Sequence, residues 1–197
     1  MMTALSPNFS RSVQAVAVGA SAGGIEALFQ LFRGLHTPFR ASIVVVLHLP
    51  DDHASKLPEV FSKRLGIAVE EAQPHAPLAP GTLYFAPPGY HLLVEADRTF
   101  SLSCDAPVLF SRPSIDVLLE SCAHTYGSGM AGLVLTGANQ DGAVGLALVK
   151  AAGGLTAVQD PAEASHTSMP LAAIAAADPH YVMPLAGLHG LLHTVIR

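Results

Sequence analysis

Three residues whose side chains could together hydrolyse an ester follow predicted strands. Ser21 lies in a glycine-rich turn after an apolar stretch, His48 follows the apolar run at 43–47, and Asp141 follows the run at 130–135. A serine hydroxyl is a poor nucleophile until a base takes its proton, and an imidazole with a pKa of about 6.5 suits that role at neutral pH. A carboxylate on the other imidazole nitrogen fixes the tautomer. These three residues therefore supply the parts of a serine hydrolase triad.

The glycine-rich turn around Ser21 also has other interpretations. Gly19-x-Ser21-x-Gly23 matches the Gly-x-Ser-x-Gly nucleophile elbow, although the order Ser, His, acid along this chain differs from that of the α/β-hydrolases. Alternatively, the turn is a degraded dinucleotide fingerprint that holds phosphate at a helix N-terminus. Taken singly, His48 is a common kind of strand-end residue and Asp141 a common helix N-cap. Their joint placement favours the triad.

Predicted strands and helices alternate along most of the chain. Strands are expected at 13–20, 43–47, 67–71, 82–86, 90–95, 99–104, 130–135, 155–159 and 181–183, and helices at 24–35, within 51–66, at 111–126 and 143–152, from 168 onward and at 185–196. This order predicts an α/β fold with a doubly wound, mostly parallel sheet, Rossmann-like and three-layered. The short strands between 82 and 104 predict an inserted antiparallel hairpin. Ligands bind such sheets beyond the carboxyl ends of the strands, where the three candidate residues would meet.

Composition narrows the class of protein. The chain has 197 residues, of which 50% are hydrophobic and 13% charged, which suits a sheet covered on both faces. The net charge of -5 argues against a nucleic-acid partner, and two cysteines are too few for a disulfide framework. We find no signal peptide, membrane-spanning run, or metal-ligand spacing. We expect a flexible tail over 1–12, one domain over 13–197, a cytoplasmic location, and no metal or cofactor.

Six blocks in the chain resemble the catalytic domain of CheB-type chemotaxis protein-glutamate methylesterases. They are Val18-Gly19-Ala20-Ser21-Ala22-Gly23-Gly24, His48-Leu49-Pro50, Ala86-Pro87-Pro88-Gly89-Tyr90-His91, Arg112-Pro113-Ser114-Ile115-Asp116, Leu135-Thr136-Gly137-Ala138-Asn139-Gln140-Asp141-Gly142 and Ser168-Met169-Pro170. The resemblance runs from about Val13 to the C-terminus with the blocks in order. It implies that Ser21 attacks the γ-methyl ester of a receptor glutamate, that His48 transfers the proton to methanol, and that Asp141 orients His48. It also implies glutamine deamidation and, as partners, the cytoplasmic helices of methylated chemoreceptors.

Further residues acquire roles through this resemblance. The backbone N–H groups of Ala22 and Ala138 are the expected donors to the oxyanion. Arg112 is expected either to line the substrate cleft or to serve structure alone, and His91 matches a family position without an assigned role.

The chain also departs from the family pattern. Ala138 stands where a methionine is common, and Leu171 stands where an arginine commonly follows Met-Pro. A tail of 12 residues cannot be the N-terminal receiver domain usual in these enzymes. The chain is therefore expected to be a stand-alone member, with a phosphorelay regulator acting in trans, or an excised domain. The alternatives are a non-catalytic binding or signalling module on the same fold, a nucleotide-binding enzyme, and an esterase acting outside chemotaxis.

Overall fold

The computed structural model describes residues 13–36, 38–49 and 56–197, and its centre is a sheet of seven parallel strands. The strands are β1 (Ala15–Ala20), β2 (Ser42–Leu47), β3 (Ala68–Glu71), β4 (Thr82–Phe85), β7 (Met130–Val134), β8 (Leu155–Gln159) and β9 (Tyr181–Met183). Their order across the sheet is β3-β4-β2-β1-β7-β8-β9. The predicted fold class is confirmed. The predicted tail at 1–12, and the part of the predicted loop that spans 51–55, lie outside the described residues.

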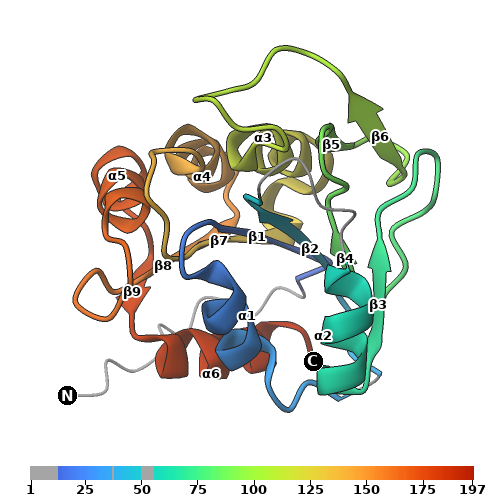
Figure 1. Ribbon diagram of the computed structural model, residues 1–197, viewed down its shortest axis with the longest axis horizontal. Coiled ribbons are helices and arrows are strands. Elements are labelled where there is room, and N and C mark those ends of the chain that lie inside the picture. Colours follow the sequence, from blue (N-terminus) through green and yellow to red (C-terminus); the bar gives the residue numbers. More distant parts are fainter. Residues whose placement is uncertain (1–12, 37, 50–55) are drawn as a thin grey trace.

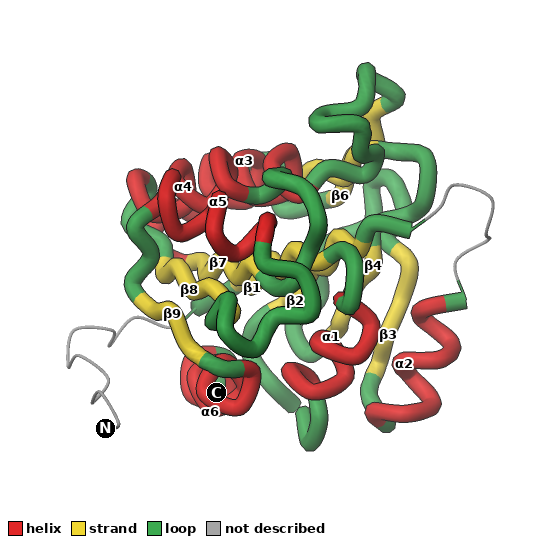
Figure 2. The backbone as a smooth tube through the Cα atoms, turned by 60° about the vertical axis from the view of Figure 1, so that its left-hand side comes forward, coloured by secondary structure: helices red, strands yellow, loops and turns green. Residues whose placement is uncertain are grey.

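Helices cover both faces of the sheet (Figures 1 and 2). One layer holds α1 (Gly24–Phe32), α2 (Leu57–Leu65) and α6 (Leu185–Val195), and the other holds α3 (Ile115–Tyr126), α4 (Ala143–Ala151) and α5 (Ser168–Ala177), with a 3₁₀ turn at Gly127–Gly129 before β7. Alternate side chains of each strand enter opposite cores, so Val16 and Val18 pack toward the first layer and Ala17 toward the second. Because both faces are covered, β1, β2 and β7 are buried throughout, and apart from Ser42 at the start of β2 their residues are apolar or glycine.

The inserted hairpin consists of β5 (His91–Val94) and β6 (Phe100–Ser103), which pair antiparallel. Leu92 and Phe100 are buried in the same core as the side chains of α3, so the hairpin extends the layer of α3, α4 and α5 and not the central sheet. The first of the three short strands between 82 and 104 is not part of the hairpin. It is β4, which pairs in parallel with β2 and β3 and buries Leu83 and Phe85 in the opposite core.

The sheet topology brings the carboxyl ends of β1, β2 and β7 together. β1 lies between the other two, and the ladder of backbone hydrogen bonds continues past the strand ends. The N–H of His48 donates to the carbonyl of Ala20 at 3.1 Å, and the N–H of Ser21 donates to the carbonyl of Thr136 at 3.0 Å. Ser21 therefore sits between the segments that carry His48 and Asp141. In the described part of the chain, no helix combines the length and apolar content needed to cross a bilayer.

Candidate active site

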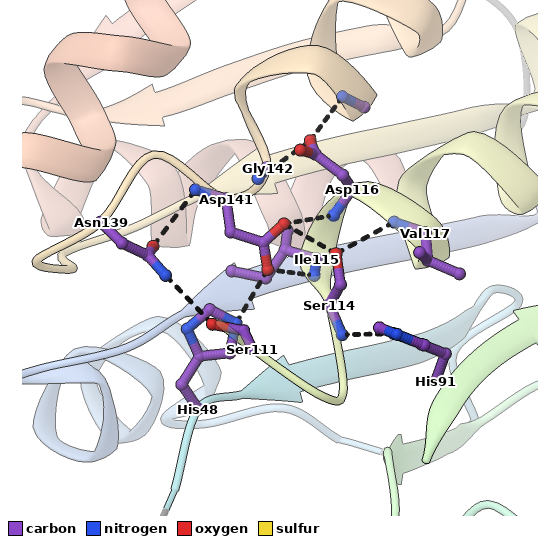
Figure 3. Close-up of polar contacts among 11 residues, drawn as sticks. His48, His91, Ser111, Ser114, Ile115, Asp116, Val117, Asn139, Asp141 and Gly142 are labelled. Carbon is purple, nitrogen blue, oxygen red and sulfur yellow. Dashed lines mark hydrogen bonds and ion pairs between the residues drawn. The ribbon is translucent and has the colours of Figure 1, made fainter. Parts of the chain in front are cut away.

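His48 and Asp141 form the central contact of the site (Figure 3). Nε2 of His48 lies 2.9 Å from Oδ2 of Asp141, whose side chain is fully buried, while that of His48 is 12% exposed. Since the carboxylate is an acceptor, Nε2 carries the hydrogen and Nδ1 is the basic nitrogen. The contact joins residues 93 positions apart in the sequence. It arranges an imidazole to take a proton through Nδ1.

The carboxylate of Asp141 is held at the N-terminus of α3 (Figure 3). The N–H of Ile115 donates to Oδ2 at 2.7 Å, while the N–H of Asp116 at 3.0 Å and the Ser114 hydroxyl at 2.8 Å donate to Oδ1. Burial by itself would raise the pKa of Asp141, but the hydrogen bonds from His48, these two N–H groups and Ser114 outweigh it and lower the pKa. Asp141 is therefore an ionised, fixed acceptor for His48.

The N-termini of α3 and α4 clamp each other. Oδ1 of Asp116 accepts the N–H of Gly142 at 2.9 Å and that of Gly145 at 2.7 Å. Gly142 has φ +98°, and a Cβ there would lie 2.8 Å from Cγ2 of Ile115, so only glycine suits this position. Burial raises the pKa of Asp116, the Gly145 N–H partly offsets it, and the charge of Asp141 raises it further. The clamp fixes the backbone beside Asp141.

Ser21 stands at the turn between β1 and α1. Gly23, two residues on, has φ +80°, and a Cβ there would lie 2.8 Å from Cβ of Ser165. The Thr136 hydroxyl donates to the carbonyl of Ala22 at 2.9 Å and accepts the N–H of His166 at 2.9 Å. The turn that presents Ser21 is thus tied to the segments that follow β7 and β8.

Ser21 and His48 line the same hollow, whose volume is about 430 Å³. Its lining residues are Ser21, Ala22, Gly23, Gly24, Ile25, Glu26, Leu47, His48 and Leu49. Within the described part of the chain, the Ser21 hydroxyl makes no hydrogen bond to the imidazole. Nucleophile–base contacts are often long in free enzymes and tighten when substrate binds. The structure thus pairs His48 with Asp141 and places Ser21 beside them without a direct bond.

Two backbone N–H groups are available near the nucleophile. Among the described residues, the N–H groups of Ala22 and Ala138 donate to no acceptor, whereas the intervening Gly137 N–H donates to the carbonyl of His166 at 3.2 Å. An oxyanion that forms at Ser21 needs N–H donors that are free in this way. No group of three or more His, Cys, Asp or Glu side chains in the described segments is placed to hold a metal ion.

Comparison with known proteins identifies the family. The profile of CheB methylesterases matches residues 16–192. The chain belongs to the CheB methylesterase family. The crystal structure of the Thermotoga maritima CheB methylesterase catalytic domain superposes with a TM-score of 0.85 and 30% identity, over 91% of this chain and 99% of that one. The family prediction is confirmed, and with it, at the level of the family, the prediction of a methylesterase-type enzyme.

Relatives of this CheB-family chain differ in length. A Leptospira interrogans protein, named a putative protein-glutamate methylesterase/protein-glutamine glutaminase, is 43% identical over 87% of this chain and 89% of its own length. The protein-glutamate methylesterase FrzG of Myxococcus xanthus is 36% identical over 90% of this chain but 53% of its own length. The chain thus spans nearly all of the first relative and about half of the second.

Arg112 in this CheB-family chain braces a loop. Its Nη1 donates to the carbonyls of Cys104 at 3.0 Å and Asp105 at 3.1 Å, and it does not line the hollow that holds Ser21. A structural role is therefore visible, and the role in the substrate cleft stays a prediction. The next residue, Pro113, lines a small adjoining hollow together with Leu47 and Leu49.

Sequence reasoning assigned no role to Ser114. Ser114 caps α3 by accepting the N–H of Val117 at 3.4 Å, and its hydroxyl also donates to Asp141. The helix predicted from 111 begins at Ile115, with Ser114 as its N-cap. Serine is a favoured N-cap residue, but nothing in the local sequence indicates its bond to Asp141. Asn139 was missed too: its amide donates to the Ser111 hydroxyl at 3.1 Å, and its Oδ1 accepts the N–H of Asp141 at 3.2 Å.

We expect His91 to stabilise the backbone around Asp141. His91 is buried; its Nδ1 accepts the N–H of Ser114 at 3.2 Å, so Nε2 carries the hydrogen that it donates to the carbonyl of Ala106 at 3.1 Å. His91→Ala leaves that N–H without a partner, which is expected to lower the free energy of unfolding by about 2 kcal/mol or more in urea denaturation. His91→Asn keeps an acceptor near the Nδ1 position and should lose less. Equal stability of His91→Ala and the wild type would contradict this role.

The lowered pKa of Asp141 predicts a pH dependence of stability. The Asp141 carboxyl binds its proton at a higher pH in the unfolded chain than in the folded one. Its contribution to the free energy of unfolding is therefore fully present above the ordinary pKa of 3.8 and is lost as the pH falls through the lower pKa of the folded state. When the free energy of unfolding is measured by urea denaturation between a pH of about 5 and a pH of about 3, it should fall more steeply for the wild type than for Asp141→Asn. Asp116, whose pKa is raised, acts in the opposite direction in both proteins. Parallel curves would show that Asp141 contributes nothing to the acid sensitivity.

Proposed function

We propose that this protein hydrolyses γ-methyl esters of glutamate side chains in chemoreceptors, with Ser21 as nucleophile, His48 as base and Asp141 as its orienting carboxylate. The observation that carries the proposal is the 2.9 Å contact between His48 and a buried, ionised Asp141, beside the hollow that Ser21 lines. The family supports the reaction class, since its named relatives are protein-glutamate methylesterases.

The proposed mechanism has two half-reactions, acylation and deacylation of Ser21, and in each of them His48 acts first as a base and then as an acid. Ser21 Oγ attacks the ester carbonyl carbon while Nδ1 of His48 takes the hydroxyl proton, and Asp141 stabilises the imidazolium. The N–H groups of Ala22 and Ala138 donate to the oxyanion. As the intermediate collapses, the C–O bond to the methoxy group breaks and His48 gives its proton to the methoxy oxygen, so that methanol leaves. Water then attacks the acyl-enzyme with the same base, and release of the glutamate carboxylate restores the Ser21 hydroxyl.

The substrate is proposed to be a methylated glutamate displayed on a cytoplasmic helix of a receptor. A shallow hollow at the strand ends admits a side chain that projects from a folded partner, because the reacting group need not enter a tunnel. Glutamine deamidation follows the same steps with ammonia as the leaving group. We further propose that Arg112 lines a part of the substrate cleft outside this hollow, that the protein acts in the cytoplasm, and that a phosphorelay protein regulates it in trans.

Two measurements test this function. Methylated receptor membranes should release methanol on incubation with the protein, and membranes without methylation should not. A fluorophosphonate should label one serine, Ser21, as identified by mass spectrometry, because only an activated hydroxyl reacts quickly. Labelling at Ser21 without methanol release would point to an ester outside chemotaxis. If the protein shows no labelling and also releases no methanol, the result would support a non-catalytic binding module.

A further inference from the structure

An exposed apolar tip projects from the loop between β6 and α3. Phe110 is 102% exposed, and the next most exposed large apolar side chain among the described residues is Val144, at 63%. Leu109, beside Phe110, is 46% exposed. The loop arches outside α3 at the top of Figure 1. Because Phe110 is wholly exposed to water, its side chain buries no apolar surface in this chain and adds nothing to the stability of the core. Its exposure therefore needs another explanation.

The backbone at this tip has an unfavourable conformation for its residues. Leu109 has φ +47° and Phe110 has φ +65°, and Val108 and Ser111 on either side exchange two backbone hydrogen bonds of 3.1 and 2.8 Å. This is a two-residue hairpin turn in which both central residues need positive φ, a place that Asn-Gly fills best. Bulky residues there are strained, and strained residues gather at functional sites. Local stability does not explain why Leu-Phe occupies the turn.

The tip is held rigidly from its base. Arg112 donates to the carbonyls of Cys104 and Asp105, and Nε2 of His91 donates to the carbonyl of Ala106. These bonds hold the first part of the loop, residues 104–106, in a fixed position. The position of Leu109 and Phe110 is therefore restricted as well. A rigid apolar contact loses little conformational freedom when a partner binds.

The same loop is bonded to the catalytic carboxylate segment. Ser111, the residue after Phe110, accepts a hydrogen bond from Asn139, which in turn accepts the N–H of Asp141 (Figure 3). On the other side of the loop, Pro113 lines the small hollow that shares Leu47 and Leu49 with the hollow of Ser21. The tip is therefore one residue away from a hydrogen-bonded connection to the loop that carries Asp141.

We propose that Leu109 and Phe110 form a docking tip that contacts apolar side chains on the substrate helix within about two turns of the esterified glutamate. This inference rests on the proposed function and names the element that holds the protein substrate. The net charge of -5 gives no long-range attraction to a helix on which glutamates are being exposed, which favours an apolar contact as a source of affinity. Esterification makes the glutamate neutral and adds a methyl group, which favours the ester over the anionic product beside an apolar tip.

The experiment compares two substrates of the same chemistry. One is a methylated helical receptor fragment, and the other is the γ-methyl ester of N-acetylglutamate amide, which is too small to reach the tip. In the double variant Leu109→Asn with Phe110→Gly, and in Phe110→Ser, the ratio of kcat/KM for the fragment to kcat/KM for the small ester is expected to fall by about tenfold or more. Val182→Ser, which changes an exposed apolar side chain on the edge strand β9, should keep the wild-type ratio.

A thermal measurement separates docking from folding. Because Asn-Gly suits the turn, the double variant is expected to unfold at the wild-type temperature or above, although its kcat/KM for the fragment falls. A ratio within twofold of the wild type, or an equal loss on both substrates, would overturn the docking role. If fragment hydrolysis is abolished by Ser21→Ala but the ratio is unchanged in the tip variants, only the docking tip fails. If the wild type releases no methanol from the fragment, the proposed function fails and the tip with it.

Discussion

Ser21→Ala is expected to lower kcat for methyl ester hydrolysis by at least about a thousandfold, in line with the loss of a nucleophile that acts as one unit with its base. The variant keeps the hollow and the N–H groups of Ala22 and Ala138, so substrate binding should survive with a KM near the wild-type value. What disappears is the acyl-enzyme, because no other hydroxyl takes the place of Ser21 Oγ in the proposed mechanism. Single-turnover methanol release measures the loss.

The matched control for this variant is Ser128→Ala. Ser128 lies in the 3₁₀ turn directly before β7, at the amino end of that strand, whereas the site lies beyond the carboxyl ends of the strands. Its removal should leave kcat at the wild-type value. Wild-type activity in Ser21→Ala would rule out Ser21 as the nucleophile, whatever the arrangement of the other two residues.

Asp141→Asn is expected to lower kcat by about a thousandfold to ten-thousandfold with little change in KM, as in other triads whose carboxylate is made neutral. An asparagine has nearly the same shape but only one acceptor oxygen. It cannot accept from Ile115, Asp116 and Ser114 and also from Nε2 of His48. If its amide faces His48, it donates to Nε2, and Nδ1 then carries the hydrogen and is no longer a base.

A pH profile shows whether Asp141 acts through His48. In the variant, kcat should recover partly at higher pH, where hydroxide can take over the role of the missing base. Asp97→Asn, which changes an exposed carboxylate that accepts the N–H and the hydroxyl of Thr99, is the control and should retain wild-type kcat. A loss of less than about tenfold in Asp141→Asn would show that His48 is oriented by other groups.

The elements nearest the site were predictable because burial on both faces leaves a plain pattern. β1 and β7 are apolar, and β2 is apolar after Ser42. Ser21 and His48 come directly after β1 and β2, and Asp141 lies in the loop after β7, so the three could be selected from local sequence. Short strands are less distinct. β4 has the same length and spacing as the hairpin strands, and only its pairing with β2 and β3 shows that it belongs to the parallel sheet.

By itself, the sequence determined the parallel α/β fold, the family and the three candidate residues, since each depends on patterns within a few neighbouring positions. The tertiary structure alone decided that Asp141 is held by the N-terminus of α3 and that Asn139 connects the loop of Ser111 to Asp141. Those facts join segments 25 or more positions apart, as between Asp116 and Asp141. Local sequence can show that a helix begins at Ser114, but not which carboxylate its N–H groups will meet. That choice is made by the packing of whole helices against the sheet.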